Sequence, residues 1–111
     1  MGMAILQRNL KKSIENDPEN ADAFNMLGYS NRKLGKNGEA FKYYNKALNL
    51  DPRHRGTHEY IGRLYLNLSQ PEKAKMHLDK LDSICFSVCD EYVTLEKAIE
   101  DYKKTKTISN Y

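Results

Sequence analysis

An internal repeat constrains the fold of this chain more than any other feature of its sequence. When the sequence is compared with itself at an offset of 34, Asp17-Pro18 aligns with Asp51-Pro52. Apolar and small residues align with residues of their own kind: Leu27 with Ile61, Gly28 with Gly62, Leu34 with Leu68, Ala40 with Ala74 and Leu50 with Ile84. A repeat of this length predicts similar supersecondary units that stack and share a core.

Within each period, apolar residues follow helical spacing in two runs, and a turn signal separates the runs. In the first period Gly35 stands between the runs, where a residue with positive φ would end the first helix. In the second period Ser69 stands at the break, and Pro71 suits the first turn of the next helix. The pattern predicts helices near residues 3–15, 21–34, 37–50, 55–68, 71–84 and 88–103.

These residues resemble the tetratricopeptide repeat, a helix–turn–helix unit with the same period. The motif is carried by Phe24, Leu27, Gly28, Ala40, Tyr44, Ala47 and Pro52 in the first copy, and by His58, Ile61, Gly62, Tyr65, Ala74, Leu78 and Leu81 in the second. The sequence departs from the family at Phe86, where the family has proline, and at Asn31, where it has an aromatic residue or leucine.

The resemblance implies an all-α solenoid in one domain, residues 1–111. Its parts are a half-repeat (1–20), two full repeats (21–54 and 55–87), a capping helix (88–104) and a tail (105–111). Small residues at 28, 40, 62 and 74 let the paired helices approach closely. The amphipathic pattern of the capping helix begins at Val88.

Composition and motifs exclude several classes of function. Lys and Arg number 18 against 15 Asp and Glu, and this small positive charge does not indicate a nucleic-acid partner. No apolar stretch approaches the ~20 residues of a transmembrane helix. The chain has no phosphate-binding loop, nucleophile elbow or metalloprotease motif. We therefore expect neither an enzyme nor a cofactor.

Histidine offers a weak hypothesis of a metal site. His54 and His58 are spaced i, i+4, but His54 precedes its helix and His58 fills the position of Phe24. No third ligand accompanies them, so we expect no metal. His77 is isolated in the sequence, and we expect it on an exposed helix surface.

Cys85 and Cys89 lie in the joint before the capping helix, and three interpretations stay open: a local disulfide, two buried thiols, or a redox or metal role. The joint can bring the Cα atoms within the range of about 4.4–6.8 Å that a disulfide needs. It also resembles the end of exported bacterial tetratricopeptide proteins. That resemblance implies a Cys85–Cys89 disulfide and export after loss of an N-terminal leader, with the cytoplasm as the alternative.

The candidate binding site is the concave face that the first helix of each pair would line. Counting outward from the core positions places seven side chains there, with Glu59 at the edge: Asn25, Tyr29, Arg32, Lys33, Tyr60, Arg63 and Asn67. Tyr and Arg are enriched in binding hot spots.

Charge is unevenly distributed along the chain. Residues 31–63 hold eight basic and three acidic residues, hence +5, whereas residues 79–101 hold two basic and seven acidic, hence −5. We expect a non-catalytic interaction module that binds a peptide or partner helix, with an acidic ligand as one candidate. The alternative is a structural module that self-associates into a homo-oligomer through exposed solenoid ends.

Overall fold

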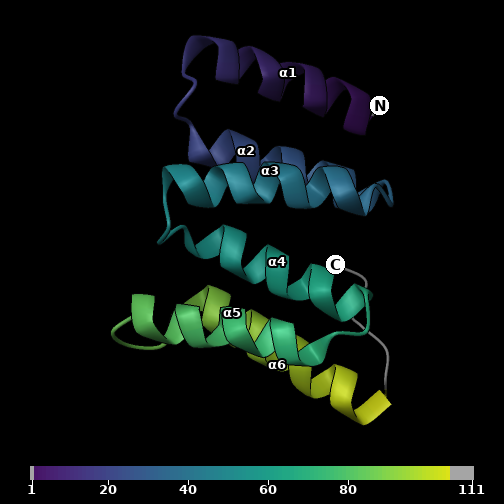
Figure 1. Cartoon of the computed structure of the whole chain (residues 1–111), viewed down its shortest axis with the longest axis vertical. Coiled ribbons are helices and arrows are strands. Elements are labelled where there is room, and N and C mark those ends of the chain that lie inside the picture. Colours follow the sequence, from purple (N-terminus) through teal and green to yellow (C-terminus); the bar gives the residue numbers. More distant parts are fainter. Residues whose placement is uncertain (1, 106–111) are drawn as a thin grey trace. The chain divides into compact units, whose positions relative to one another are not determined.

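The computed structural model describes residues 2–105, which form six helices and no strand (Figure 1). The helices are α1 (Met3–Asn16), α2 (Ala21–Lys33), α3 (Asn37–Leu50), α4 (Arg55–Asn67), α5 (Pro71–Ile84) and α6 (Asp90–Thr105). They confirm the predicted all-α class. Thr105, expected in the tail, closes α6, and the rest of the expected tail lies outside the described residues.

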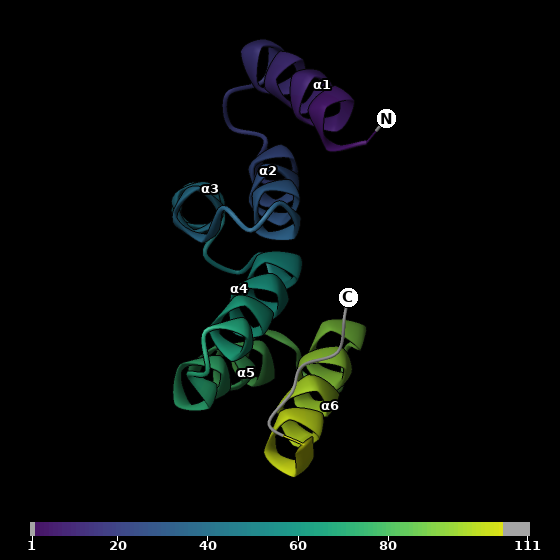
Figure 2. The ribbon, with the colours of Figure 1, turned by 90° about the vertical axis from the view of Figure 1, so that its right-hand side faces the viewer.

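The chain divides into two compact units, Met1–Thr57 and His58–Tyr111, and the boundary falls inside α4. In the first unit α2 pairs with α3, and α1 packs on α2 (Figure 2). The core consists of Ala23, Leu27, Ala40, Tyr44 and Ala47. Gly28 makes this pairing possible, because a Cβ atom there would overlap the Tyr44 ring.

The second unit has its core between α5 and α6, and Leu66 at the end of α4 also belongs to this core. The core cluster comprises Leu66, Ala74, Leu78, Leu81, Leu95, Ala98, Ile99 and Tyr102. A Cβ atom on Gly62 would lie 2.7 Å from two carbons of the Leu95 side chain, so α6 approaches α4 at this glycine. The amphipathic face predicted for the last helix is therefore buried from Leu95 onward.

The turn after α2 and the turn after α4 have the same hydrogen bonds at equivalent positions of the two repeats. Lys36 N–H donates to the Asn31 carbonyl at 2.8 Å, and Gln70 N–H donates to the Tyr65 carbonyl at 2.9 Å. Gly35 has φ 78° and Ser69 has φ 58°. This is the Schellman arrangement, in which a left-handed residue ends a helix, and it confirms the positive φ predicted at Gly35.

A disulfide between Cys85 and Cys89 closes the loop between α5 and α6, with Cα atoms 6.0 Å apart. Because this loop extends to Cys89, α6 begins later than predicted, at Asp90 instead of Val88. Val88, expected on the apolar face of the capping helix, lies instead in the loop and is 71 % exposed. The expectation for Val88 was wrong, because the residue lies in the loop before α6.

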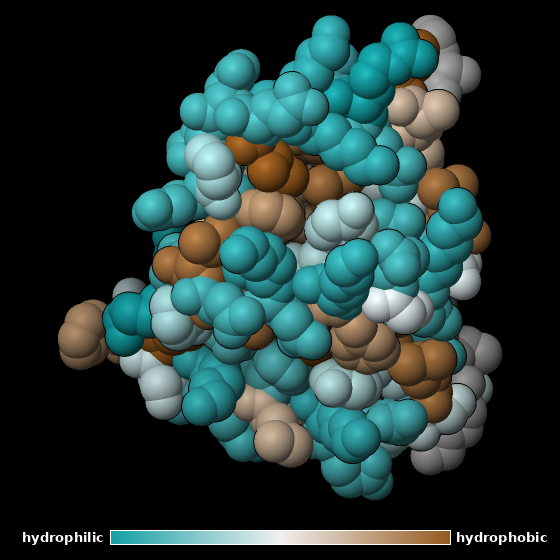
Figure 3. All heavy atoms as spheres, turned by 45° about the horizontal axis from the view of Figure 1, so that its top comes forward, coloured by the Kyte–Doolittle hydropathy of each residue, from teal (hydrophilic) through white to brown (hydrophobic). Residues whose placement is uncertain are grey.

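Most of the surface on the face drawn in Figure 3 is hydrophilic, with small separated hydrophobic areas. None of the helices within residues 2–105 is long and apolar enough to cross a membrane.

Candidate functional site

Three residues of α2 form a cluster of one aromatic ring and two cations. The guanidinium carbon of Arg32 lies 5.5 Å from the centre of the Tyr29 ring, and Lys33 Nζ lies 5.9 Å from it. Residues three and four positions apart are neighbours on a helix, which explains this grouping. Tyr29 is half-buried, Arg32 is buried and Lys33 is exposed. The structure therefore brings together three of the seven predicted residues.

Asn25, one turn earlier on α2, is buried, with only 6 % of its surface exposed. Within residues 2–105, its Oδ1 atom has no hydrogen-bond partner. Its Nδ2 atom lies 3.2 Å from the point that a Cβ on Gly56 would occupy, so the missing side chain at Gly56 leaves room for this amide. An amide both donates and accepts hydrogen bonds, which is the chemistry that a peptide backbone requires.

The predicted residues of α4 differ from one another in exposure. Arg63 is buried, with Nη1 4.0 Å from Oε2 of Glu59, which was expected at the edge of the face and is also buried. Tyr60 is half-buried and Asn67 is exposed. Arg63 and Glu59 thus form a buried ion pair one turn apart on the same helix. The grouping of these residues with those of α2 stays a prediction.

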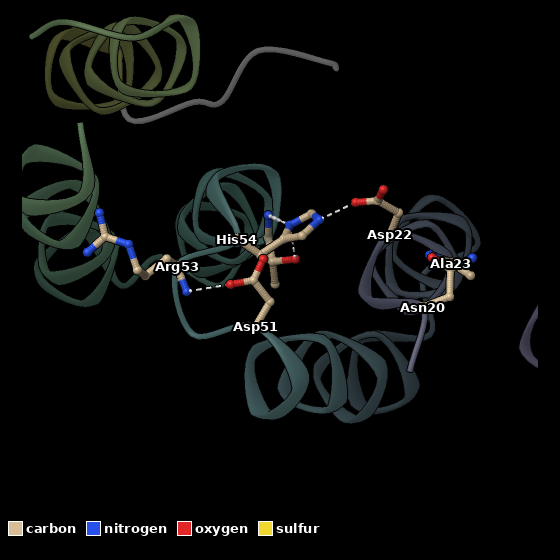
Figure 4. Close-up of polar contacts among 7 residues, drawn as sticks. Asn20, Asp22, Ala23, Asp51, Arg53 and His54 are labelled. Carbon is tan, nitrogen blue, oxygen red and sulfur yellow. Dashed lines mark hydrogen bonds and ion pairs between the residues drawn. The ribbon is translucent and has the colours of Figure 1, made fainter. Parts of the chain in front are cut away.

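His54 caps the N-terminus of α4 and joins it to α2 (Figure 4). Its Nδ1 atom accepts the Thr57 backbone N–H at 3.2 Å and lies 2.9 Å from Thr57 Oγ1. Its Nε2 atom contacts Oδ1 of Asp22. Since Nδ1 accepts from the backbone, the neutral ring carries its proton on Nε2 and donates it to the carboxylate. In the first repeat Asn20 has the same role, accepting Ala23 N–H at 3.1 Å.

His58 pairs with His77, which corrects the expectation that His77 is isolated on an exposed helix surface. The two Nδ1 atoms lie 3.0 Å apart, and the ring centres are 5.3 Å apart. His77 also stacks on Tyr65 and is half-buried instead of fully exposed. Phe24 and Tyr43, at the equivalent positions of the first repeat, also contact ring to ring, with centres 6.4 Å apart and a smaller interplanar angle of 27° against 38°. The histidine pair thus replaces an aromatic pair.

Burial lowers the pKa of His77 to about 4, with smaller contributions from His58 and Lys80. A ring with this pKa is neutral at physiological pH, so one imidazole can donate to the other. No group of three or more metal-ligating side chains occurs in the part of the chain that the structure describes.

Comparison with known proteins identifies the repeat. The tetratricopeptide repeat family model matches residues 21–54. A TPR repeat-containing protein of Borreliella burgdorferi is 32% identical over 73 residues, which make up 66% of this chain and 32% of that relative. The chain thus spans about a third of the length of this curated relative. Together with the helix pairs and their equivalent turns, these matches support a protein of the tetratricopeptide repeat family.

Proposed function

We propose that this chain is a non-catalytic interaction module that binds an acidic segment of a partner protein on the α2 face. Its contacts there are Tyr29, Arg32 and Lys33, with the Asn25 amide beside them. The observation that carries the proposal is the Tyr29 ring flanked by two cations at 5.5 and 5.9 Å. Membership of a family whose repeats generally mediate protein–protein interaction supports it.

The local charge favours an acidic ligand. The stretch 31–63 carries a net charge of +5, and Lys33 and Lys36 are exposed at the end of α2. The exposed Lys33 ammonium can pair with a ligand carboxylate, and a tyrosine ring supplies apolar contact at low entropic cost. We expect a micromolar dissociation constant, which corresponds to a binding free energy on the order of −8 kcal/mol. Binding should weaken as salt screens the exposed charges. Tyr60, Arg63 and Asn67 are proposed as ligand contacts of α4.

The test uses an acidic pentapeptide that contains one phenylalanine, and its counterpart in which every carboxylate is an amide. Lys33→Ala and Tyr29→Ala should each weaken binding of the acidic peptide about fivefold, as expected for loss of about 1 kcal/mol. Lys42→Ala on α3 is the matched control and should leave the affinity within a factor of two. Arg63→Ala is a poor first choice, because it also removes the cation that faces the buried Glu59 carboxylate.

Equal binding of the two peptides, or a larger effect at Lys42 or Lys46 than at Lys33, would refute the proposal. The alternative function, self-association through exposed ends, is favoured by the opposite charges of residues 31–63 and 79–101. Sedimentation velocity separates the two functions. A monomer at all concentrations supports the peptide-binding module, whereas association that weakens with salt supports the assembly module.

A further inference from the structure

The loop closed by the disulfide exposes two apolar side chains to solvent. Phe86 is fully exposed (103 %) and Val88 is 71 % exposed. Both lie inside the covalent ring that Cys85 and Cys89 close. An apolar side chain held in water by a short covalent ring has lost much of its freedom before any partner arrives, which lowers the entropic cost of binding.

A hollow of about 180 Å³ lies beside these side chains, lined by Asp82, Cys85, Phe86, Ser87, Val88 and Tyr92. Its volume corresponds to about six water molecules, enough for the end of one long side chain. Two aromatic rings and Val88 supply apolar contact, and Asp82 supplies a negative charge. This lining combines the two kinds of surface that a long cationic side chain requires.

The Asp82 carboxylate is exposed and makes no hydrogen bond or ion pair within residues 2–105. Asp79, one turn earlier on α5, is already bound to Lys75. Tyr92 donates to Glu96 at 3.4 Å. Its pKa is raised first by desolvation and then by the negative charges of Glu96 and Asp82, so both carboxylates lie near this hydroxyl. The Lys75 charge acts on the same hydroxyl in the opposite direction, so the negative charge that the hollow itself presents is that of Asp82.

We propose that this hollow binds an arginine side chain carried by an extended segment of a partner protein. The guanidinium group stacks on the exposed Phe86 ring and pairs with the Asp82 carboxylate, while its methylene groups contact Val88 and Tyr92. Arginine fits better than lysine because its planar group stacks on aromatic faces and pairs with carboxylates through two hydrogen bonds. The site lies outside the α2 face, and its ligand has the opposite charge.

The test is a nuclear magnetic resonance titration of the oxidised full chain with acetyl-arginine methylamide. The probe for comparison is the citrulline analogue, which has nearly the same shape and no charge. We expect the arginine probe to shift amide signals within residues 82–92 with a dissociation constant on the order of 1 mM. The citrulline probe should bind at least about fivefold more weakly, as expected for loss of a charge-assisted contact.

Three single variants distinguish this site from general attraction to acidic surface. Asp82→Asn should weaken the arginine probe at least about fivefold, and Phe86→Ala should weaken it about two- to fivefold. Asp79→Asn removes the same charge one turn away and should change the affinity less than about twofold. Because residues 82 and 86 are exposed, both variants should retain the melting temperature of the original chain.

Three results would overturn the proposal. The first is equal binding of the two probes, and the second is an equal effect of Asp79→Asn and Asp82→Asn. The third is self-association that Phe86→Ala abolishes in sedimentation velocity, since the loop would then dock on a second copy of the chain. None of these results bears on binding of acidic peptides at Lys33, so each proposal can fail without the other.

Discussion

At the scale of single residues, Gly28 has less room for a side chain than the other glycines of the first unit. A Cβ atom at this position would overlap two carbons of the Tyr44 ring, and Tyr44 is fully buried. We expect Gly28→Ala to lower the free energy of unfolding by about 1–3 kcal/mol, the usual cost of overpacking a core. Urea denaturation followed by circular dichroism measures this change.

Gly38 provides the matched control, because it lies in α3 and a Cβ there would meet nothing within 4 Å. Gly38→Ala should leave the stability unchanged or raise it by up to about 1 kcal/mol, since alanine restricts the unfolded chain. Equal losses from Gly28→Ala and Gly38→Ala would mean that the contact with Tyr44 does not limit the size of residue 28.

A second prediction at this scale concerns the cap of α4. His54→Ala removes the Nδ1 atom that accepts Thr57 N–H, and should lower the free energy of unfolding by about 1 kcal/mol. His54→Asn introduces the residue that caps α2 at position 20 and should recover most of this loss. If His54→Asn is as destabilising as His54→Ala, the contact with Asp22 is the more important one.

At the scale of elements, the contact of α4 with α5 through His58 and His77 makes stability depend on pH. The pKa of His77 is about 4 in the folded chain and about 6.5 when unfolded. As pH falls from 6.5 to 4, the unfolded chain takes up the proton first, so stability falls. The loss is below about 3 kcal/mol, because the ring is partly exposed.

Unfolding with urea at several pH values between 7 and 4.5 measures this dependence. The double variant His58→Phe with His77→Tyr installs the aromatic pair of the first repeat, Phe24 and Tyr43, and should flatten the curve. A curve of unchanged slope in that variant would assign the pH dependence to carboxylates elsewhere in the chain.

The joint between α5 and α6 gives a prediction about the disulfide. A ring this short contributes about 2 kcal/mol through the entropy of the unfolded chain. Reduction should therefore increase amide hydrogen exchange within residues 86–104 more than in α2 and α3, which lie in the other unit. Exchange that rises equally in all helices would show that the disulfide stabilises the whole fold.

At the scale of the whole molecule, the two compact units predict how substitutions combine. Gly28 belongs to the first unit and Gly62 to the second, so their effects should add within about 0.5 kcal/mol. Gly62→Ala should cost less than Gly28→Ala, because the Leu95 side-chain carbons that it meets can move whereas a ring cannot. A double variant much less stable than the sum would show strong coupling between the units.

The helices were predictable from the sequence because the internal repeat presents several local signals twice, as at Asp17-Pro18 and Asp51-Pro52. The exposure of side chains at the candidate site could not be predicted, because it depends on tertiary packing. Arg63 and Asn25 are buried, although counting along the helix expects them at a surface. The start of α6 was placed two residues too early, at Val88 instead of Asp90, because the apolar pattern continues into the loop. The histidine pair could have been found by carrying the Phe24–Tyr43 contact through the repeat.

The turns after α2 and α4 have the same hydrogen bonds although different residues occupy their left-handed positions. Gly35 adopts a left-handed conformation readily, whereas Ser69 adopts it at a cost of about 1–2 kcal/mol, and yet both close the same pair of hydrogen bonds. The same turn thus forms with glycine or serine at the left-handed position. In such an architecture the connections are free to diverge in sequence, and a new residue at a turn can acquire a role without altering the helices that the turn joins.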